Sequence, residues 1–262
     1  CCRKYGVKRI IFSSSAATYG DVADSALPIS ETLPQQPLSF YGLTKKTAEN
    51  YLELYRLAYG IDYVVLRFAN VYGERQGDGG EGGVISIFAK RIAEGKGITI
   101  FGDGNQTRDF VYAGDIADGI LDALTTEAAN TAYNLSTSEE TSLKELVAIL
   151  SKVSGKEIVP AYDKPREGDI YRSSLNNAKA KCNLYWEPKV SLEEGLRRTY
   201  EDFFRKEHFD AVVHLAAQTL VSDSMIDPEH DMHENIAGTV RILECCRKYG
   251  VKRIIFSSSA AT

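Results

Sequence analysis

The chain has 262 residues, a hydrophobic fraction of 44% and a formal net charge of −5, which are values typical of a folded globular protein. It contains no arginine-rich run, basic stripe or zinc-finger spacing, so we expect no nucleic acid among its partners. It also has no apolar run that could span a bilayer and no signal-peptide pattern, so we expect a cytoplasmic protein with no membrane partner.

Predicted strands and helices alternate along the first 208 residues. The β-branched run at 7–15 predicts a buried strand that ends in three serines, and a turn-rich stretch with three prolines follows it. The next elements are a long helix at 41–60, closed by Gly60, a strand at 62–68, a glycine-rich loop at 73–83, a helix near 84–94, a strand at 98–102, a helix at 113–124, a short strand at 132–136, and helices at 142–155 and from 191 to about 206. This alternation indicates an α/β fold with a mostly parallel sheet.

The C-terminal part repeats the beginning of the chain. A predicted strand at 209–217 and a helix at 229–249 lead into "CCRKYGVKRIIFSSSAAT", which occupies 1–18 and again 245–262. Joined head to tail, the chain would close with a period of 244 residues (262 − 18). Three interpretations are open: a natural permutation, an engineered one, or a reading frame from a circularised or misassembled DNA fragment. The identical overlap and the first residue, which is not Met, favour the last.

Tyr41 and Lys45 form a Y-x-x-x-K pair on one face of the long helix. An ammonium beside a phenol favours the phenolate, so we expect a lowered phenol pKa and a usable base. Ser15 lies at the carboxyl end of the preceding strand, where open α/β sheets place their ligands. The alternative is that Ser13–Ser15 only end a strand and that the Tyr–Lys spacing arose by chance.

Six motifs in order carry a family resemblance: "FSSSAATYG", "SFYGLTKKTAE", "LRFANVYG", "ITIFGDGNQTRDFVYAGDIADGI", "REGD" and "YWEPKVSLEEGLRRT". The chain resembles the extended short-chain dehydrogenase/reductases, and within them most resembles nucleotide-sugar epimerases of the UDP-glucose 4-epimerase type. The tail "FDAVVHLAAQ…ENIAGTVRILE" resembles the part of that family that precedes "FSSS". Nearly the whole chain is covered.

The resemblance implies an incomplete Rossmann-like doubly wound parallel sheet with a smaller α/β substrate-binding domain. Residues 1–73 would form the central part of the Rossmann-like domain and carry the catalytic residues. Residues 74–208 would mainly bind the nucleotide sugar. Residues 209–262 would form a strand–helix–strand unit that precedes residue 1 in relatives.

The resemblance also implies a role for each matching residue. Tyr41 would be the catalytic base, Lys45 its electrostatic partner, and Ser15 a hydrogen-bonding helper. NAD would be the cofactor, contacted by Tyr41, Lys45, Phe68, Ala216 and Gln218. The substrate would be held by Ser15, by Asn70 near the sugar diphosphate, by Val84, by Thr99 and Phe101 around the uracil, by Arg108 and Arg166 on the diphosphate, and by Asp169 on the uridine ribose. Without the resemblance, surface salt bridging is the simpler interpretation of the two arginines.

The implied reaction is NAD-dependent epimerisation of a UDP-sugar at carbon 4, as between UDP-glucose and UDP-galactose, through a 4-keto sugar. A homodimer is also implied. Related sugar-nucleotide dehydratases carry an Asp-Glu pair after the active-site Ser or Thr, and here Ala16 and Ala17 occupy those places. We expect no metal, because the cysteines lack ligand spacing and "HDMHE", with His230 and His233, suits an exposed helix or a dimer interface.

The family's glycine-rich turn, resembling T-G-G-x-G-F-I-G, does not occur in these 262 residues. "GDGGEGG" at 77–83 follows no strand, so we interpret it as a loop. Ala216 and Gln218 cannot replace that turn. Three alternatives to the epimerase therefore stay open: a catalytically impaired UDP-sugar binding fragment, a non-functional fragment, or another extended short-chain dehydrogenase such as a dehydratase. The second copy of "FSSSAAT", with Ser259 in the place of Ser15, lacks a following Y-x-x-x-K helix and is expected to be structural or artefactual.

Overall fold

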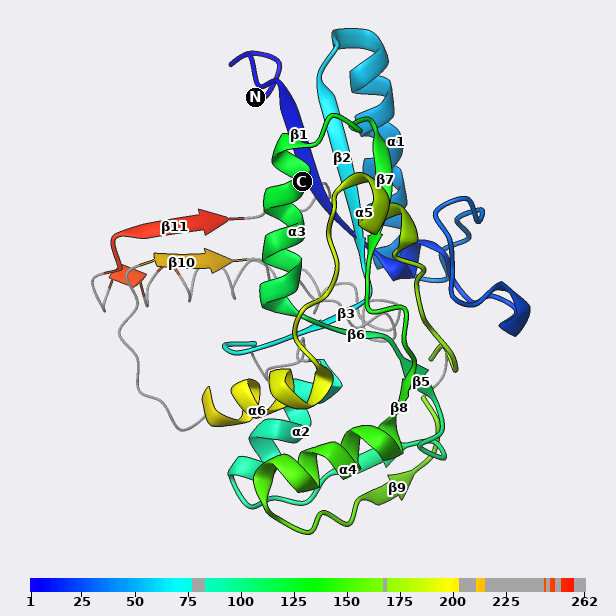
Figure 1. Cartoon of the computed structure of the whole chain (residues 1–262), viewed down its shortest axis with the longest axis vertical. Coiled ribbons are helices and arrows are strands. Elements are labelled where there is room, and N and C mark those ends of the chain that lie inside the picture. The colour runs from blue at the N-terminus through cyan, green and yellow to red at the C-terminus, as the bar shows by residue number, and fades with distance from the viewer. Residues whose placement is uncertain are drawn as a thin grey trace.

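The main sheet has three parallel strands in the order β1 (Arg9–Ser15), β2 (Asp62–Phe68) and β7 (Thr131–Leu135). The computed structural model describes residues 1–76, 83–166, 169–202, 211–214, 243, 246–247 and 251–256. Helices α1 (Phe40–Tyr59) and α3 (Ala113–Thr125) contact the sheet and lie along it (Figure 1). The mixed α/β fold with parallel strands confirms the predicted fold class.

Helix α1 follows from its end residues. The Ser39 hydroxyl caps its first turn by accepting a hydrogen bond from the Gly42 N–H at 3.0 Å. Gly60 ends the helix with φ of 69°, a left-handed conformation that glycine adopts without strain. The predicted helix at 41–60 and the predicted strand at 62–68 are confirmed, whereas β1 begins two residues later than expected.

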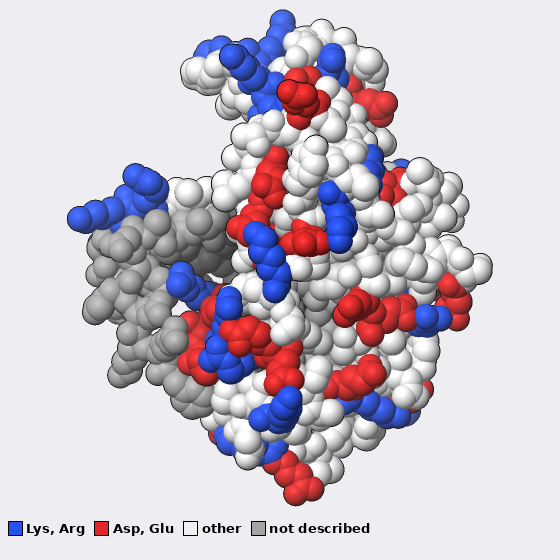
Figure 2. Space-filling view, viewed as in Figure 1, with Lys and Arg blue, Asp and Glu red and all other residues white. Residues whose placement is uncertain are grey.

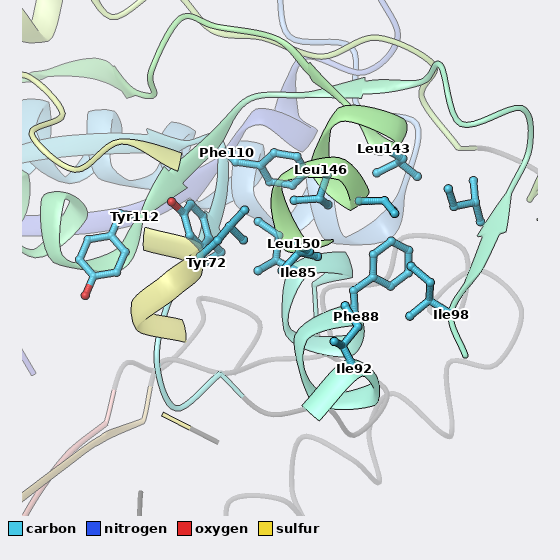
Figure 3. Packing of buried hydrophobic residues seen from close by; sticks show 13 residues of the cluster. Tyr72, Ile85, Phe88, Ile92, Ile98, Phe110, Tyr112, Leu143, Leu146 and Leu150 are labelled. Atoms are coloured by element: carbon cyan, nitrogen blue, oxygen red, sulfur yellow. The ribbon is translucent and has the colours of Figure 1, made fainter. Parts of the chain in front are cut away.

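A second core lies beyond the sheet and is built by α2 (Val84–Ala93), α4 (Leu143–Ser154) and α6 (Leu192–Asp202), which pack on one another (Figures 1 and 3). A capping box between Ser142 and Glu145 begins α4. Strand β4 (Thr99–Phe101) pairs with β9 (Ala161–Asp163) beside these helices. Helix α6 is described as far as Asp202, and its predicted end near residue 206 lies outside the described residues.

Short strands that the sequence did not predict connect the two cores. Strands β3 (Asn70–Tyr72) and β6 (Phe110–Tyr112) pair in parallel. Phe110 and Tyr112 belong to the second core (Figure 3), while Val111 between them belongs to the core that covers the sheet. A further antiparallel pair joins β5 (Thr107–Arg108) to β8 (Thr141–Ser142).

The two cores do not divide at residue 73. Helix α3, strand β7 and helix α5 (Ala178–Asn183) all fall within 74–208, yet their buried residues pack with Val64 and Leu66 of the main sheet. The chain therefore returns to the first core twice after leaving it.

In the tail, β10 (Ala211–His214) and β11 (Arg253–Phe256) form a separate parallel pair. The expected helix at 229–249 and most of the loop at 73–83 lie outside the described residues. Within the described ranges, none of the helices has the length and apolar character needed to cross a membrane.

Candidate active site

The Ser15 and Tyr41 side chains meet where β1 ends and α1 begins. Ser15 is the last residue of β1, and its hydroxyl accepts a hydrogen bond from the Ala17 N–H at 3.1 Å, which starts the short helix η1 (Ala16–Thr18). A hydrogen bond joins the Tyr41 phenol to Ser15. The first turn of α1 lies so close to η1 that a Cβ on Gly42 would stand 2.3 Å from the Ala17 carbonyl oxygen. Glycine at this position therefore permits the contact between tyrosine and serine.

Lys45 lies one turn after Tyr41, as its spacing predicts. Its Nζ donates to the Ser13 carbonyl oxygen at 3.0 Å and lies 5.5 Å from the centroid of the Tyr41 ring. Burial lowers the pKa of Lys45. Burial also raises the pKa of Tyr41, and the hydrogen bond to Ser15 opposes that rise. The expected lowering of the phenol pKa is therefore wrong, because desolvation outweighs the hydrogen bond from Ser15.

A third residue of the same helix face, Glu49, was not predicted. Its carboxylate accepts a hydrogen bond of 2.5 Å from the Ser14 hydroxyl and forms an ion pair with Arg67 of β2, with Nη2 and Oε2 2.6 Å apart. The side chains of Glu49 and Arg67 are each 8% exposed. Tyr41, Lys45 and Glu49, on successive turns of α1, thus contact Ser15, Ser13 and Ser14 in that order. The three serines therefore anchor this helix rather than only end a strand.

The buried polar network extends through the base of the site. The Arg67 guanidinium donates to the Tyr19 hydroxyl at 2.8 Å, and that hydroxyl donates to the Asn134 side-chain oxygen at 2.8 Å. Tyr19 and Asn134 are fully buried. The signal available in the sequence was an arginine inside the apolar run "VVLRF", because a charge buried in a strand requires a partner.

Of the remaining residues assigned to the cofactor, Phe68 is described and Ala216 and Gln218 lie outside the described residues. Phe68 is half-buried and stands opposite Ser15 in the parallel register of β1 and β2. The structure therefore brings Phe68 to the same sheet edge as Ser15 and Tyr41.

Residues assigned to the nucleotide gather around β4 and β5. Arg108 forms an ion pair with Asp169, and its guanidinium also donates to the Thr107 carbonyl oxygen at 2.8 Å. The Arg166 guanidinium lies 4.3 Å from the centroid of the Phe101 ring. The structure thus pairs Arg108 with the residue assigned to the ribose, and Arg166 with a residue assigned to the uracil.

Thr99 and Val84, also assigned to the nucleotide, differ in their surroundings. Thr99 and Phe101 are alternate residues of β4, so their half-buried side chains share one face. Val84 begins α2 and packs against the second core, and no contact of the structure ties it to Arg108 or Arg166 among the described residues.

Asp109, which was not predicted, connects the residues at the sheet edge with the residues assigned to the nucleotide. Its carboxylate accepts hydrogen bonds from the Thr137 N–H and hydroxyl at 2.8 and 2.6 Å, from the Ser138 N–H at 3.1 Å and from the Leu175 N–H at 3.3 Å. Burial raises the pKa of Asp109 to about 6. Its carbonyl oxygen accepts from the N–H of the exposed Asn70 at 2.8 Å. Asp109 therefore fixes Asn70, two residues after Phe68, beside Arg108.

Charges of both signs alternate over the face seen in Figure 2. No group of three or more His, Cys, Asp and Glu side chains that could hold a metal ion occurs in the part of the chain that the structure describes. His230 and His233 lie outside that part.

A parallel α/β sheet with Ser, Tyr and Lys at its carboxyl edge, and arginines beyond it, defines the class of extended short-chain dehydrogenase/reductases. Comparison with known proteins agrees: the NAD dependent epimerase/dehydratase family matches residues 1–136 and 176–262. The chain belongs to this family.

Named relatives include UDP-glucose 4-epimerases. A putative UDP-glucose 4-epimerase of Methanocaldococcus jannaschii is 48% identical over 197 residues, which cover 75% of this chain and 63% of that protein. The UDP-glucose 4-epimerase of Mycolicibacterium smegmatis is 39% identical over 204 residues, covering 78% and 64%. A crystal structure of the Thermotoga maritima UDP-glucose 4-epimerase with UDP-glucose is 44% identical with a TM-score of 0.75, covering 78% and 65%. The chain thus spans less than two thirds of the length of these relatives.

Proposed function

We propose that this chain carries the catalytic and sugar-nucleotide residues of an NAD-dependent epimerase acting at carbon 4 of a UDP-hexose, of the UDP-glucose/UDP-galactose type. The observation that carries the proposal is the arrangement of Ser15, Tyr41 and Lys45 at one sheet edge, with the phenol hydrogen-bonded to the serine. Two similar proteins, 39% and 44% identical, are named UDP-glucose 4-epimerases, and others are named UDP-glucuronate or UDP-N-acetylglucosamine 4-epimerases, so carbon 4 is common to these names.

The donor set at the sheet edge fits a nicotinamide cofactor. An ammonium has three N–H donors, and among the described residues the Lys45 ammonium uses one of them, for the Ser13 carbonyl oxygen. Its remaining donors suit ribose hydroxyls, with the Tyr41 phenol one helical turn away. When bound, NAD supplies the hydride acceptor and donor that the chemistry requires.

In this proposal Tyr41 takes the proton of the sugar 4-hydroxyl and returns it after the sugar has turned over. Ser15, hydrogen-bonded to the phenol, orients the same hydroxyl. Arg108 and Arg166 hold the diphosphate by charge-assisted hydrogen bonds, with Asp169 turned to the ribose. Ala16 and Ala17 provide no second acid and base for an elimination, which favours epimerisation over dehydration.

The test is conversion of UDP-galactose to UDP-glucose by the full chain with added NAD, followed by chromatography of the sugar nucleotides. We expect Tyr41→Phe to abolish turnover while retaining UDP-sugar binding. Tyr185→Phe is the matched control, because the Tyr185 side chain is exposed and has no role in the proposed site or dimer. Undiminished turnover in Tyr41→Phe would refute the assigned base.

A second candidate is a UDP-sugar binding protein without turnover. Its support is the pairing of Arg108 with Asp169 and of Arg166 with Phe101, which involves none of the three residues Ser15, Tyr41 and Lys45. Calorimetry separates the two candidates: UDP binding that Arg108→Gln weakens, together with no turnover and no NAD binding, would identify the binding protein.

We also propose a homodimer for this chain. Leu43, Tyr51, Leu54 and Tyr55 are exposed apolar residues along α1, a helix whose opposite side is fixed to the sheet. Sedimentation of the full chain should give twice the mass of 29.0 kDa, and Leu54→Glu should reduce the sedimenting mass to that of a single chain. A monomeric native chain would contradict the proposal.

A further inference from the structure

The Lys45 ammonium lies over two aromatic rings. Its Nζ is 5.3 Å from the centroid of the Phe12 ring and 5.5 Å from the centroid of the Tyr41 ring. A cation within about 6 Å of a ring centroid is attracted to the negative face of the ring. Tyr41 already has a role in the proposed reaction, whereas no step of that reaction involves Phe12.

The alternation of side chains along β1 brings Phe12 to helix α1. Ile11 packs with the core beside α3, so Phe12 points to the opposite face of the sheet. Ser14, two residues on, shares the face of Phe12, and its hydroxyl donates to Glu49 of α1. Phe12 therefore meets α1 at Lys45, one helical turn before the place where Ser14 meets it.

Lys45 forms no ion pair within the described ranges. Glu49, on the next turn of α1, has its carboxylate paired with Arg67 of β2. Residues 12–18, which end β1 and form η1, contain no ionisable side chain. The titratable group that faces the ammonium is the Tyr41 phenol. The positive charge is therefore stabilised by a carbonyl oxygen and by aromatic rings instead of a carboxylate.

An aromatic ring suits this ammonium better than a carboxylate would. Burial withdraws water from the charge and lowers the pKa of Lys45. A ring face returns part of the lost stabilisation but accepts no conventional hydrogen bond. A carboxylate would take up the N–H donors that the Ser13 carbonyl oxygen leaves free. The ring thus preserves the donors that the proposed function requires for a ribose.

We infer that Phe12 is a positioning residue of this site, whose ring holds the Lys45 ammonium beside Tyr41 while leaving its hydrogen-bond donors free. The inference rests on the proposed function, in which Lys45 serves the cofactor and the base. The repeated segment supplies a matched control, because Phe256 of β11 occupies the place of Phe12 in the second copy. No Y-x-x-x-K segment follows it in residues 257–262.

The first test measures Lys45 directly and needs no substrate. The full chain is labelled with trace acetic anhydride at stepped pH, and peptide mass spectrometry compares Lys45 with Lys152, whose side chain is 70% exposed. Phe12→Leu removes the ring and keeps an apolar side chain. Because the neutral amine reacts, loss of the ring should move the labelling midpoint of Lys45 to lower pH and raise its rate below the midpoint about threefold or more. Phe12→Tyr and Phe256→Leu should label like the native chain.

The labelling profile separates the charge effect from a change in access. A rate that rises by the same factor at every pH would reflect access alone and would overturn the inference. Phe12→Met also lacks the ring and replaces Phe12→Leu if circular dichroism shows that the leucine variant does not fold. An unmoved midpoint in the folded variants without the ring would likewise overturn the inference.

The second test links Phe12 to the reaction. In turnover of UDP-galactose with NAD, Phe12→Leu should move the basic limb of the kcat profile to lower pH, since Lys45 loses its charge sooner. The KM for UDP-galactose should stay unchanged, because Phe12 lies over Lys45 and not beside the residues assigned to the nucleotide. A moved labelling midpoint with no turnover in the native chain would support the contact and count against the proposed function. A moved midpoint with an unmoved basic limb would overturn the positioning role.

Discussion

The buried ion pair between Arg67 and Glu49 offers the sharpest test of how this site is held together. Both side chains are 8% exposed, and the Arg67 guanidinium makes contacts of 2.6 Å to Glu49 and 2.8 Å to Tyr19. Arg67→Met removes the cation while roughly keeping the length of the side chain. It leaves the Glu49 carboxylate buried without its main partner, which costs about 3–5 kcal/mol of unfolding free energy.

A matched control lies on the same helix and strand. Arg56 and Asp62 form an ion pair of 3.0 Å whose side chains are 44% and 40% exposed. Solvent screens such a pair, so Arg56→Met should cost about 1 kcal/mol or less. The two variants remove the same chemical group from pairs that join α1 to β2, and they differ mainly in burial.

Urea unfolding followed by circular dichroism measures both losses. The double variant Arg67→Met with Glu49→Leu should recover part of the loss, because it removes the unpaired carboxylate. Recovery should stay incomplete, since Ser14 and Gln35 also donate to Glu49 and would lose their acceptor. If Arg67→Met costs no more than Arg56→Met, the reasoning from burial is wrong.

Two further predictions concern single residues. Gly42→Ala should lower the unfolding free energy by about 1–3 kcal/mol and weaken the Tyr41–Ser15 contact, because the added Cβ would stand 2.3 Å from the Ala17 carbonyl oxygen. Gly97→Ala, with no atom within 4 Å of the added Cβ, is the control. Equal melting temperatures for the two variants would contradict the prediction. Burial raises the pKa of Asp109 from 3.8 to about 6, so the folded state keeps a proton that the unfolded state has lost. Unfolding free energy should therefore fall by about 3 kcal/mol as pH rises through that interval, and Asp109→Asn should lack this fall in urea titrations at stepped pH. Identical pH profiles for the two proteins would exclude Asp109 as the cause.

Local sequence signals predicted the elements around the site well. The stop at Gly60 marked the end of α1, and the spacing of Tyr41 and Lys45 placed both on one face of it, whereas the cap at Ser39 was not predicted. The same spacing could not tell where the ammonium would point, and its bond to the Ser13 carbonyl oxygen became visible only in three dimensions. The expectation of a lowered phenol pKa was wrong for the same reason, because burial depends on tertiary packing.

The residues missed by the sequence act through distant partners. Glu49 follows the Tyr–Lys pair by one turn and looks like an ordinary surface residue of a helix until Arg67 is placed against it. Asp109 bonds to groups at 137, 138 and 175, none of them a neighbour in sequence. Strands β3 and β6 have three residues each, too few for a periodic pattern to identify.

The paired strands β3 and β6 contribute side chains to both hydrophobic cores. Phe110 and Tyr112 face one core and Val111 the other, and across the pair Tyr72 and Val71 divide in the same way. Because β3 and β6 contribute apolar side chains to both cores, unfolding of either core would expose apolar residues of this strand pair to water. Neither half can therefore be cut away at residue 73 and be expected to fold alone. The two cores should melt in one cooperative step, and proteases should find no early cleavage point between them.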